Sequence, residues 1–252
     1  MLPTRRSVNN GRVDAEKPTV VILCGGRGTR LHEHASSVPK PLIEIGGRPI
    51  LWHVVSMYLA HGFRRFLLLT GYRSARVAAF AAGERWPDGV EVTCLDTGED
   101  TPTGGRLHQA APALEGDRCC LAYADGVADI DLGALLAYHG KHGGAATMAV
   151  VQPELPFGVA RLNGDATVRG FTEKPRSDLW VNAGFFCFER SALGVLTADS
   201  VLEREPLERL AAAGDLHAFR HHGFWECMDT YKDAITLNGL WDEGRAPWKV
   251  WS

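Results

Sequence analysis

Charged side chains that could handle phosphate groups stand in and after a glycine-rich turn near the start of the chain. The turn follows an apolar run and contains three glycines and two arginines: Gly25, Gly26, Arg27, Gly28 and Arg30. Glycines have no Cβ atom, so the N–H groups of such a turn can converge on an anion. Lys40 adds a further cation and is held between Pro39 and Pro41. These residue types at this spacing indicate a phosphate-binding site.

The glycine turn has alternative roles that the local sequence alone leaves open. It could serve only to reverse the chain. A dinucleotide-binding fingerprint would need a third glycine where this chain has Leu31, and an acidic residue about 20 positions later. A P-loop would need Lys-Ser or Lys-Thr after a glycine, and the turn has neither.

Two aspartates that lie far apart in the sequence could bind a divalent cation. Asp125 follows the apolar run of residues 119–123, and Asp229 lies between an extended stretch and a helix. Magnesium typically takes one or two protein carboxylates together with phosphate oxygens of the substrate. Each aspartate could instead cap a helix, and the local pattern leaves both roles open.

Hydrophobic periodicity predicts the elements that would bring these residues together. Strands are expected over residues 20–24, 63–70, 90–95, 119–123, 145–151 and 181–188, with a hairpin at 157–171 and extended structure at 217–229. Helices are expected over residues 49–60, 73–82, 132–139, 191–196, 205–213 and 231–241, and the turn at 101–106 opens another that ends at 114. Asp131 is expected to cap the helix at 132–139. Alternating strands and helices predict an α/β, doubly wound parallel sheet that binds ligands at the carboxyl ends of its strands, where the Gly25 turn falls.

The composition is that of an ordinary globular protein. The 252 residues are 45% hydrophobic and carry a net charge of −3, which indicates neither nucleic-acid nor membrane binding. No apolar run approaches the roughly 20 residues that cross a bilayer, and no secretory signal is recognisable. Six cysteines without a Cys-x-x-Cys pair favour free thiols in the cytoplasm. Residues 1–17 are expected to form a flexible tail, and residues 18–252 a single domain.

Three motifs taken together resemble the sugar-1-phosphate nucleotidyltransferase family. They are Gly-Gly-x-Gly-Thr-Arg-Leu at residues 25–31, Pro-Lys-Pro at 39–41 and Gly-Gly-Arg-Pro-Ile at 46–50. The closest resemblance is to the glucose-1-phosphate cytidylyltransferases and runs from residue 19 to the C-terminus. It is carried by residues 40–53, 96–98, 103–107, 125–129, 223–230, 239–241 and 246–249. The connection between Phe80 and Val92 is shorter than the insertion typical of that family.

The resemblance implies a Rossmann-like, doubly wound, mixed but mostly parallel sheet of the nucleotide-diphospho-sugar transferase type, and a role for each candidate residue. The implied catalytic residues are Arg30, Lys40, Asp125 and Asp229, with Mg²⁺ on the two aspartates. The implied nucleotide-binding residues are Leu23, Cys24, Gly25, Gly26, Arg27, Gly28, Thr29, Thr101, Gly105 and Arg106. The implied sugar-phosphate residues are Gly158, Glu173, Lys174, Asn182 and Gly184. Without the resemblance, Glu173-Lys174 is typical of a solvated turn.

The function implied by the resemblance is transfer of a nucleotidyl group from a nucleoside triphosphate to a sugar-1-phosphate, with release of pyrophosphate. CTP and glucose-1-phosphate are the favoured substrates, and a homo-oligomer is expected. The alternatives are the same chemistry with GTP, UTP, dTTP or another sugar-1-phosphate. Two further alternatives are a catalytically silent sugar-nucleotide-binding protein and an NAD-dependent oxidoreductase.

Overall fold

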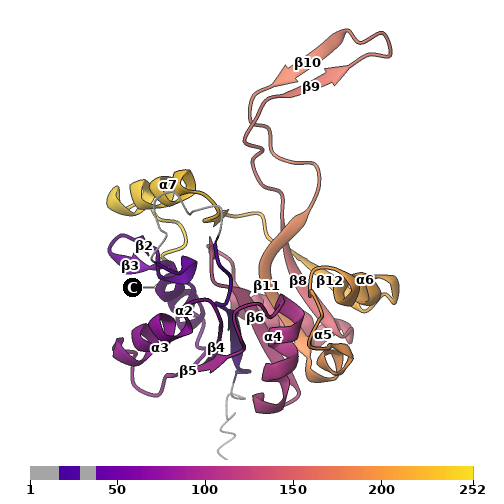
Figure 1. Ribbon diagram of the computed structural model, residues 1–252. Coiled ribbons are helices and arrows are strands. Elements are labelled where there is room, and N and C mark those ends of the chain that lie inside the picture. Colours follow the sequence, from indigo (N-terminus) through magenta and orange to yellow (C-terminus); the bar gives the residue numbers. More distant parts are fainter. Residues whose placement is uncertain (1–16, 29–37, 252) are drawn as a thin grey trace, which may run out of the picture.

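A mixed, mostly parallel sheet forms the centre of the computed structural model, which describes residues 17–28 and 38–251. Its seven strands lie in the order β12-β8-β11-β6-β1-β4-β5 (Figure 1). Their bounds are β1 Val20–Leu23, β4 Arg65–Thr70, β5 Glu91–Asp96, β6 Arg118–Tyr123, β8 Ala146–Val151, β11 Val181–Glu189 and β12 Leu216–Arg220. Only β11 runs antiparallel to its neighbours, β6 and β8, among the strand pairs of this sheet. The predicted fold class is confirmed.

Helices cover both faces of the sheet because successive strand residues point to opposite sides. Val20 and Ile22 of β1 join the core beneath one group of helices, whereas Val21 joins the core beneath the other. The first group is α2 (Ile50–Ala60), α3 (Ser74–Gly83), α5 (Leu132–His142) and α7 (Tyr231–Asp242). The second group is α4 (Thr103–Ala110), α6 (Glu205–Ala212) and the 3-10 helix η4 (Arg190–Val195).

Most predicted elements are present, and the differences have local causes. The helix expected to end at residue 114 stops at Ala110 and continues as the 3-10 helix η3 (Ala111–Ala113), because Pro112 has no N–H to donate. The segment expected to be helical at 191–196 is the 3-10 helix η4. The extended stretch at 217–229 is two strands, β12 and β13 (Trp225–Cys227), with different partners. Asp131 caps α5 as predicted, and its Oδ1 accepts the Ala134 N–H at 2.8 Å.

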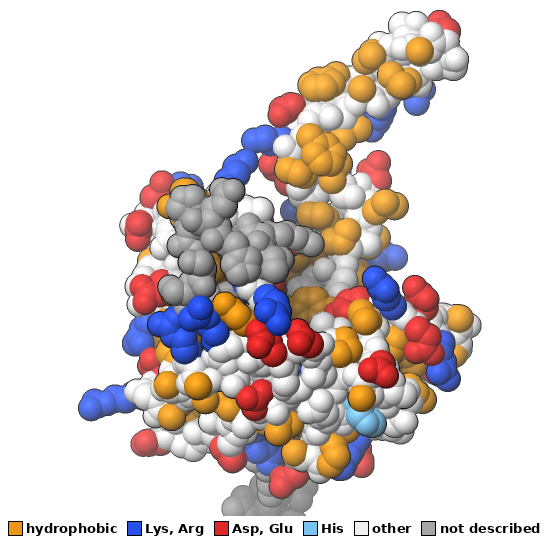
Figure 2. Space-filling view, viewed as in Figure 1, with side chains coloured by type: hydrophobic (Ala, Val, Ile, Leu, Met, Phe, Trp, Pro, Cys, Tyr) orange, Lys and Arg blue, Asp and Glu red, His pale blue; other side chains and the backbone are white. Residues whose placement is uncertain are grey.

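The arm, residues 152–180, is the part of the chain that leaves the body of the protein (Figure 1). Its strands β9 (Val159–Leu162) and β10 (Val168–Thr172) form the predicted hairpin and pair antiparallel. Large hydrophobic side chains stay exposed along it, among them Phe157 (60%), Phe171 (66%) and Leu179 (75%). Figure 2 shows this apolar surface on the arm.

The predicted tail, residues 1–17, lies outside the described residues except for Lys17. The Lys17 ammonium donates to the carbonyl oxygen of His61 at the end of α2. No helix in the described ranges is both long and apolar enough to cross a membrane. Since both core clusters pack on one sheet, we infer that residues 18–252 form a single domain.

Candidate active site

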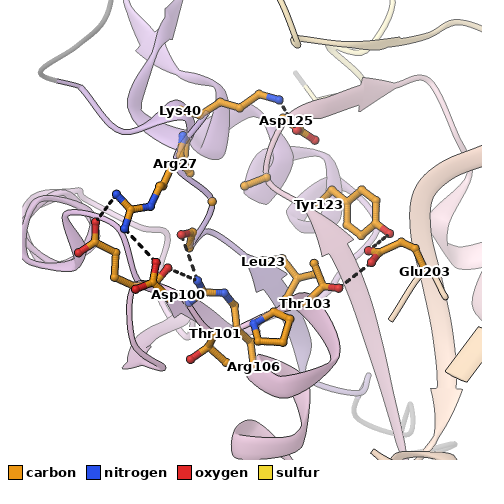
Figure 3. Close-up of a pocket in the computed structure, with 16 residues that line it drawn as sticks. Leu23, Arg27, Lys40, Asp100, Thr101, Thr103, Arg106, Tyr123, Asp125 and Glu203 are labelled. Carbon is orange, nitrogen blue, oxygen red and sulfur yellow. Dashed lines mark hydrogen bonds and ion pairs between the residues drawn. The ribbon is translucent and has the colours of Figure 1, made fainter. Parts of the chain in front are cut away.

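A pocket of about 380 Å³ opens where the strands β1, β4, β5 and β6 end (Figure 3). These strands are mutually parallel, so their carboxyl ends meet at one edge of the sheet. The pocket is lined by Leu23, Gly25, Gly26, Arg27, Lys40, Pro41, Glu99, Asp100, Thr101, Pro102, Thr103, Arg106, Tyr123, Ala124, Asp125 and Glu203. Eight of these are residues that the sequence placed in the catalytic or nucleotide-binding set: Leu23, Gly25, Gly26, Arg27, Lys40, Thr101, Arg106 and Asp125.

The Arg106 guanidinium holds the pocket wall together from behind the glycine turn. The side chain is 4% exposed and donates to five oxygens within 3.1 Å. These are the carbonyl oxygens of Gly25, Thr70, Gly98 and Glu99, and Oγ1 of Thr97. Burial lowers the pKa of Arg106 from its usual value, although nearby acidic groups oppose that shift. Sequence reasoning expected a nucleotide contact here, and the structure adds a positioning role.

Gly25 is glycine because Arg106 leaves no room for a side chain. A Cβ atom on Gly25 would lie 2.1 Å from the guanidinium carbon of Arg106. A Cβ on the next residue, Gly26, would meet nothing within 4 Å. The two adjacent glycines therefore serve different purposes: Gly25 allows close packing, and Gly26 leaves open space at the pocket.

The Arg27 side chain is not a solitary phosphate-binding cation. Its guanidinium forms ion pairs with Glu99 at 3.0 Å and Asp100 at 2.9 Å, and its guanidinium carbon lies 5.7 Å from the centre of the Tyr72 ring. The hydrogen bond to Asp100, followed by the charge of Glu99, raises the pKa of Arg27. Arg27 therefore ties the glycine turn to the loop after β5.

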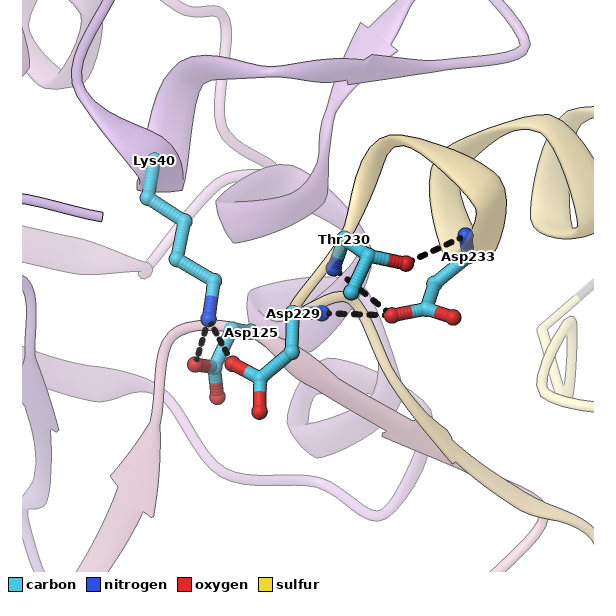
Figure 4. Close-up of polar contacts among 5 residues, drawn as sticks. All are labelled: Lys40, Asp125, Asp229, Thr230 and Asp233. Atoms are coloured by element: carbon cyan, nitrogen blue, oxygen red, sulfur yellow. Dashed lines mark hydrogen bonds and ion pairs between the residues drawn. The ribbon is translucent and has the colours of Figure 1, made fainter. Parts of the chain in front are cut away.

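Lys40, Asp125 and Asp229 meet at the edge of the pocket (Figure 4). Lys40 Nζ lies 2.6 Å from Asp125 Oδ2 and 2.6 Å from Asp229 Oδ1. Burial alone would lower the pKa of Lys40, but the charges and hydrogen bonds of the two carboxylates outweigh it and raise the pKa. In the sequence these residues were separate candidates, and the fold brings them into contact.

Strand pairing explains how residues more than a hundred positions apart come together. β7 (Gly126–Ala128) pairs antiparallel with β13, and Gly126 lies opposite Cys227. The Met228 N–H also donates to the Asp125 carbonyl oxygen at 2.8 Å. Asp125 and Asp229 therefore flank one short two-stranded ladder.

Helix capping does not account for either aspartate. Thr230, not Asp229, caps α7, and it forms a capping box with Asp233. The Asp233 carboxylate accepts the N–H groups of Thr230 at 2.7 Å and Asp229 at 3.0 Å. Asp125 is followed by β7 rather than by a helix. Cation binding is the role that the geometry favours.

Asn182 and Gly184 connect to the pocket through Tyr123. Asn182 Nδ2 donates to the Tyr123 hydroxyl at 3.1 Å, and its Oδ1 accepts the Gly184 N–H at 2.8 Å. The Tyr123 hydroxyl donates to Glu203 at 2.5 Å, and Thr103 Oγ1 donates to the same carboxylate at 2.6 Å. Burial, with the Glu203 charge next, raises the pKa of Tyr123.

Tyr123 and Glu203 are pocket residues that sequence reasoning missed. Tyr123 had a usable signal, because it ends a buried strand two residues before Asp125 and therefore stands at the same edge of the sheet. Glu203 had none, since it belongs to the charged segment that leads into α6 and reaches the pocket only through tertiary structure.

Gly158, Glu173 and Lys174 stand on the arm and are not among the residues that line the pocket. Glu173 and Lys174 are exposed. A Cβ atom on Gly158 would lie 2.3 Å from the Phe171 ring and 2.7 Å from Glu173 Oε2, so arm packing already requires glycine there. The structure brings Gly158 next to Glu173 within the arm, apart from the residues that line the pocket with Asp125.

The remaining predicted nucleotide-binding residues lie behind the pocket wall or outside the described residues. Cys24 is fully buried, its N–H donates to the Leu69 carbonyl oxygen, and burial raises its thiol pKa. Gly105 donates its N–H to the Ser200 carbonyl oxygen at 2.9 Å. Gly28 follows Arg27 with a φ of +62°. Thr29 and Arg30 lie outside the described residues.

A mostly parallel sheet with helices on both faces and a pocket at its strand ends defines an α/β protein of the doubly wound class, whose ligands typically bind at that edge. Residues 19–226 match the family model described as nucleotidyl transferase. The chain belongs to the nucleotidyl transferase family. The resemblance drawn from the sequence motifs is thereby confirmed.

Relatives of known name extend over most of the chain. Glucose-1-phosphate cytidylyltransferase of Salmonella typhimurium is 40% identical over an alignment of 258 positions, which covers 92% of this chain and 98% of that protein. Mannose-1-phosphate guanylyltransferase catalytic subunit beta of Drosophila pseudoobscura is 30% identical over 223 residues, 86% of this chain and 60% of that protein. The crystal structure of HddC from Yersinia pseudotuberculosis shares the fold, with a TM-score of 0.71 at 19% identity over 89% of this chain and 100% of that one.

Proposed function

We propose that this protein transfers the cytidylyl group of CTP to a sugar-1-phosphate, with glucose-1-phosphate as the favoured acceptor, and releases pyrophosphate. The observation that carries the proposal is the meeting of Lys40, Asp125 and Asp229 beside a pocket of about 380 Å³. A pocket of this volume suits a nucleotide-sized ligand. The 40% identity to the Salmonella typhimurium cytidylyltransferase supports the choice of CTP and glucose-1-phosphate.

The chemistry asks the protein mainly to position charges. A phosphate oxygen of the acceptor forms a bond to the α-phosphorus of CTP, and the bond from that phosphorus to pyrophosphate breaks. The attacking phosphate is already ionised at neutral pH, so the rate acceleration comes from alignment of the substrates and neutralisation of their charge. Gly26 leaves room for the nucleotide, Gly25 lets the turn pack on Arg106, and the Lys40 ammonium meets phosphate charge. We assign Arg30 the catalytic role that the sequence resemblance implies for it.

Asp125 and Asp229 are the residues that would hold Mg²⁺. Their oxygens already converge on one cationic atom, Lys40 Nζ, at 2.6 Å each, so the pair suits a positive ion. Within residues 17–28 and 38–251 no group of three or more His, Cys, Asp or Glu side chains is arranged to hold a metal. Two protein carboxylates with water and substrate phosphate are typical for magnesium. When bound, Mg²⁺ would neutralise charge on the phosphates.

On the acceptor side, we assign Lys174 to the sugar phosphate and Glu173 to the sugar hydroxyls. Gly158, Asn182 and Gly184 would border the ring. Asn182 already reaches the pocket through its hydrogen bond to Tyr123. Glu173 and Lys174 stand on the arm (Figure 1). This assignment therefore requires the arm to approach an acceptor that is bound at the pocket.

The experiment that tests the substrate choice is a matrix of CTP, UTP, GTP and dTTP against several sugar-1-phosphates, read by release of pyrophosphate. A site that hydrogen-bonds the amino group of cytosine leaves polar groups unpaired when uracil binds. We expect CTP to exceed UTP by more than about 10-fold in kcat/KM. Preference for another nucleotide would overturn the cytidylyl assignment and leave nucleotidyl transfer standing.

The same matrix tests the other candidate functions. GTP is the alternative donor with a specific observation behind it, since a mannose-1-phosphate guanylyltransferase is 30% identical to this chain. A silent sugar-nucleotide-binding protein would release no pyrophosphate with any pair. An oxidoreductase would require binding of NAD(P)H, which the missing third glycine at Leu31 disfavours.

We also infer a homo-oligomer in the cytoplasm. Exposed side chains on the arm form an apolar surface of the kind that marks contact sites. The six cysteines are free thiols, which suits a reducing compartment. Sedimentation of the purified protein tests the oligomer, and fractionation of cells tests the location.

A further inference from the structure

Lys40 occupies the place between two carboxylates that the proposed function gives to a metal ion. Its Nζ lies 2.6 Å from Asp125 Oδ2 and 2.6 Å from Asp229 Oδ1 (Figure 4). The Lys40 side chain is 14% exposed, so it is packed into this position rather than extended into solvent. An ammonium and a divalent cation cannot share the same two oxygens, because their charges would repel at contact distance.

The two carboxylates stay near each other whether or not Lys40 is between them. The Met228 N–H donates to the Asp125 carbonyl oxygen at 2.8 Å, and the β7–β13 ladder lies immediately beside it. Two carboxylates held this close repel each other unless a cation lies between them. The backbone therefore maintains a site that always requires a positive group.

A second position for the Lys40 ammonium lies within reach. Lys40 lines the nucleotide pocket together with Gly25 and Gly26. Its Cβ lies against the glycine turn, 2.9 Å from where a Cβ on Gly28 would be. A lysine carries its charge on a flexible four-carbon chain, so the ammonium can move while the backbone at η2 (Lys40–Leu42) stays in place. Phosphates bound over the turn would attract it.

We propose that Lys40 is a resident cation that closes the aspartate pair to free metal ions, and that nucleotide phosphates open the pair by drawing the ammonium away. This inference rests on the proposed function, because it takes Asp125 and Asp229 as the metal ligands. Metal ion and nucleotide then bind cooperatively, since each favours the state in which Lys40 has left the aspartates. Without nucleotide, the apparent metal affinity equals the intrinsic affinity multiplied by the fraction of molecules in which Lys40 has left the aspartates.

Mn²⁺ alone, followed by the electron paramagnetic resonance of the unbound ion, measures this occupancy on the full chain. Without nucleotide, Lys40→Met is expected to bind Mn²⁺ at least ~10-fold more tightly than the wild type. The same variant is expected to bind CTP in EDTA more weakly, by calorimetry, because the phosphates lose a cation. Tighter binding of Mn²⁺ together with weaker binding of CTP is the result expected if the Lys40 ammonium moves between the aspartates and the nucleotide phosphates.

The matched control is Lys232→Met, which removes an exposed lysine three residues after Asp229. It lowers the positive charge near the site without vacating the aspartates, so both affinities should remain at the wild-type value. Lys40→Gln is the second variant if Lys40→Met unfolds at a lower temperature. Asp125→Asn combined with Lys40→Met should remove the gain in Mn²⁺ affinity.

The outcomes separate this inference from the proposed function. Equal Mn²⁺ affinity in wild type and both Lys40 variants, with binding lost on Asp125→Asn, would overturn the resident-cation role and leave the metal site intact. Mn²⁺ binding that is indifferent to Asp125→Asn would overturn the metal assignment itself. No Mn²⁺ binding by any variant, with or without CTP, would overturn both.

Discussion

The nucleotide pocket and the arm differ in how much of the fold holds them in place. The pocket lies at the edge of a seven-stranded sheet, and one buried arginine fixes four of its backbone carbonyls. The arm is a two-stranded hairpin whose Phe157, Phe171 and Leu179 side chains are more than half exposed. A two-stranded hairpin is marginally stable unless it packs against something else.

This difference separates the two halves of the proposed reaction. Folding of the body already positions the residues that we propose bind the nucleotide, and the aspartate pair. The residues assigned to the sugar phosphate depend on where the arm lies. Substitutions in the pocket should therefore affect turnover or stability, whereas substitution of the exposed Glu173 or Lys174 on the arm should affect acceptor binding.

The largest effect is expected for the aspartate pair. Asp125→Asn or Asp229→Asn should lower kcat at least ~10²-fold, because each removes charge from the ion that neutralises the reacting phosphates. Steady-state release of pyrophosphate measures the change. Asp165→Asn, the same substitution on the exposed turn of the arm, is the control and should leave kcat unchanged. Near-normal turnover in a folded Asp125 or Asp229 variant would remove these residues from the active site.

The adjacent Gly25 and Gly26 offer the second test, which concerns the rigidity of the pocket wall. Gly25→Ala should lower the free energy of unfolding by about 1–3 kcal/mol, because its Cβ would lie 2.1 Å from the Arg106 guanidinium carbon. Gly26→Ala is the matched control, since its Cβ would meet nothing within 4 Å. Urea unfolding of both variants measures the difference. Equal stability would show that Arg106 yields easily and that the wall is less rigid than inferred.

Substitution of Lys174 on the arm should change acceptor binding and leave stability unchanged, the reverse of the effect expected at Gly25. Lys174→Met is expected to raise KM for the sugar-1-phosphate about 10-fold through loss of one charge-assisted contact, with an unchanged melting temperature. Lys141→Met, an exposed lysine on α5, is the control for general loss of charge. Unchanged acceptor KM in Lys174→Met would take this residue out of the sugar-phosphate site.

Lowering the pH should reduce the free energy of unfolding through protonation of His53. This is the smallest of the four predicted effects. Nε2 of His53 lies 2.8 Å from the Ile45 carbonyl oxygen, and Nδ1 accepts the Trp248 Nε1–H, so the buried ring is neutral. Burial lowers its pKa from 6.5 to about 4. Between these values the unfolded chain binds more protons, so stability decreases as pH falls below 6.5.

The expected loss from His53 is about 1 kcal/mol of unfolding free energy between pH 6.5 and 5.5. Urea unfolding at the two pH values measures it, and an NMR titration of the ring checks its origin. In His53→Gln this part of the pH dependence should disappear. A wild-type free energy that is the same at both pH values would refute the assignment.

Local signals in the sequence were enough to predict much of this structure. The apolar runs before Gly25 and Asp125 identified buried strands, and the carboxyl ends of parallel strands necessarily meet at one edge. Asp229 needed more, since the β7–β13 pairing that brings it to Asp125 joins segments a hundred residues apart. Glu203 and the inward role of Arg106 depend on side-chain packing, which leaves no periodic pattern. The arm was predicted as a hairpin, but where it stands is a tertiary property.

The Arg106 guanidinium has a consequence for how this chain can vary. It fills the volume that a Cβ on Gly25 or on Gly71 would need, at 2.1 Å and 2.4 Å. Loss of the arginine would leave the Gly25, Thr70, Gly98 and Glu99 carbonyls without this donor, and gain of a side chain at either glycine would expel the arginine. Each change is harmful alone, so Gly25 and Arg106 should covary in evolution, and a library that randomises one of them should recover the parental residue unless the other is randomised with it. Gly71 stays constrained in either case, because its Cβ would also lie 2.6 Å from the Gly98 carbonyl oxygen.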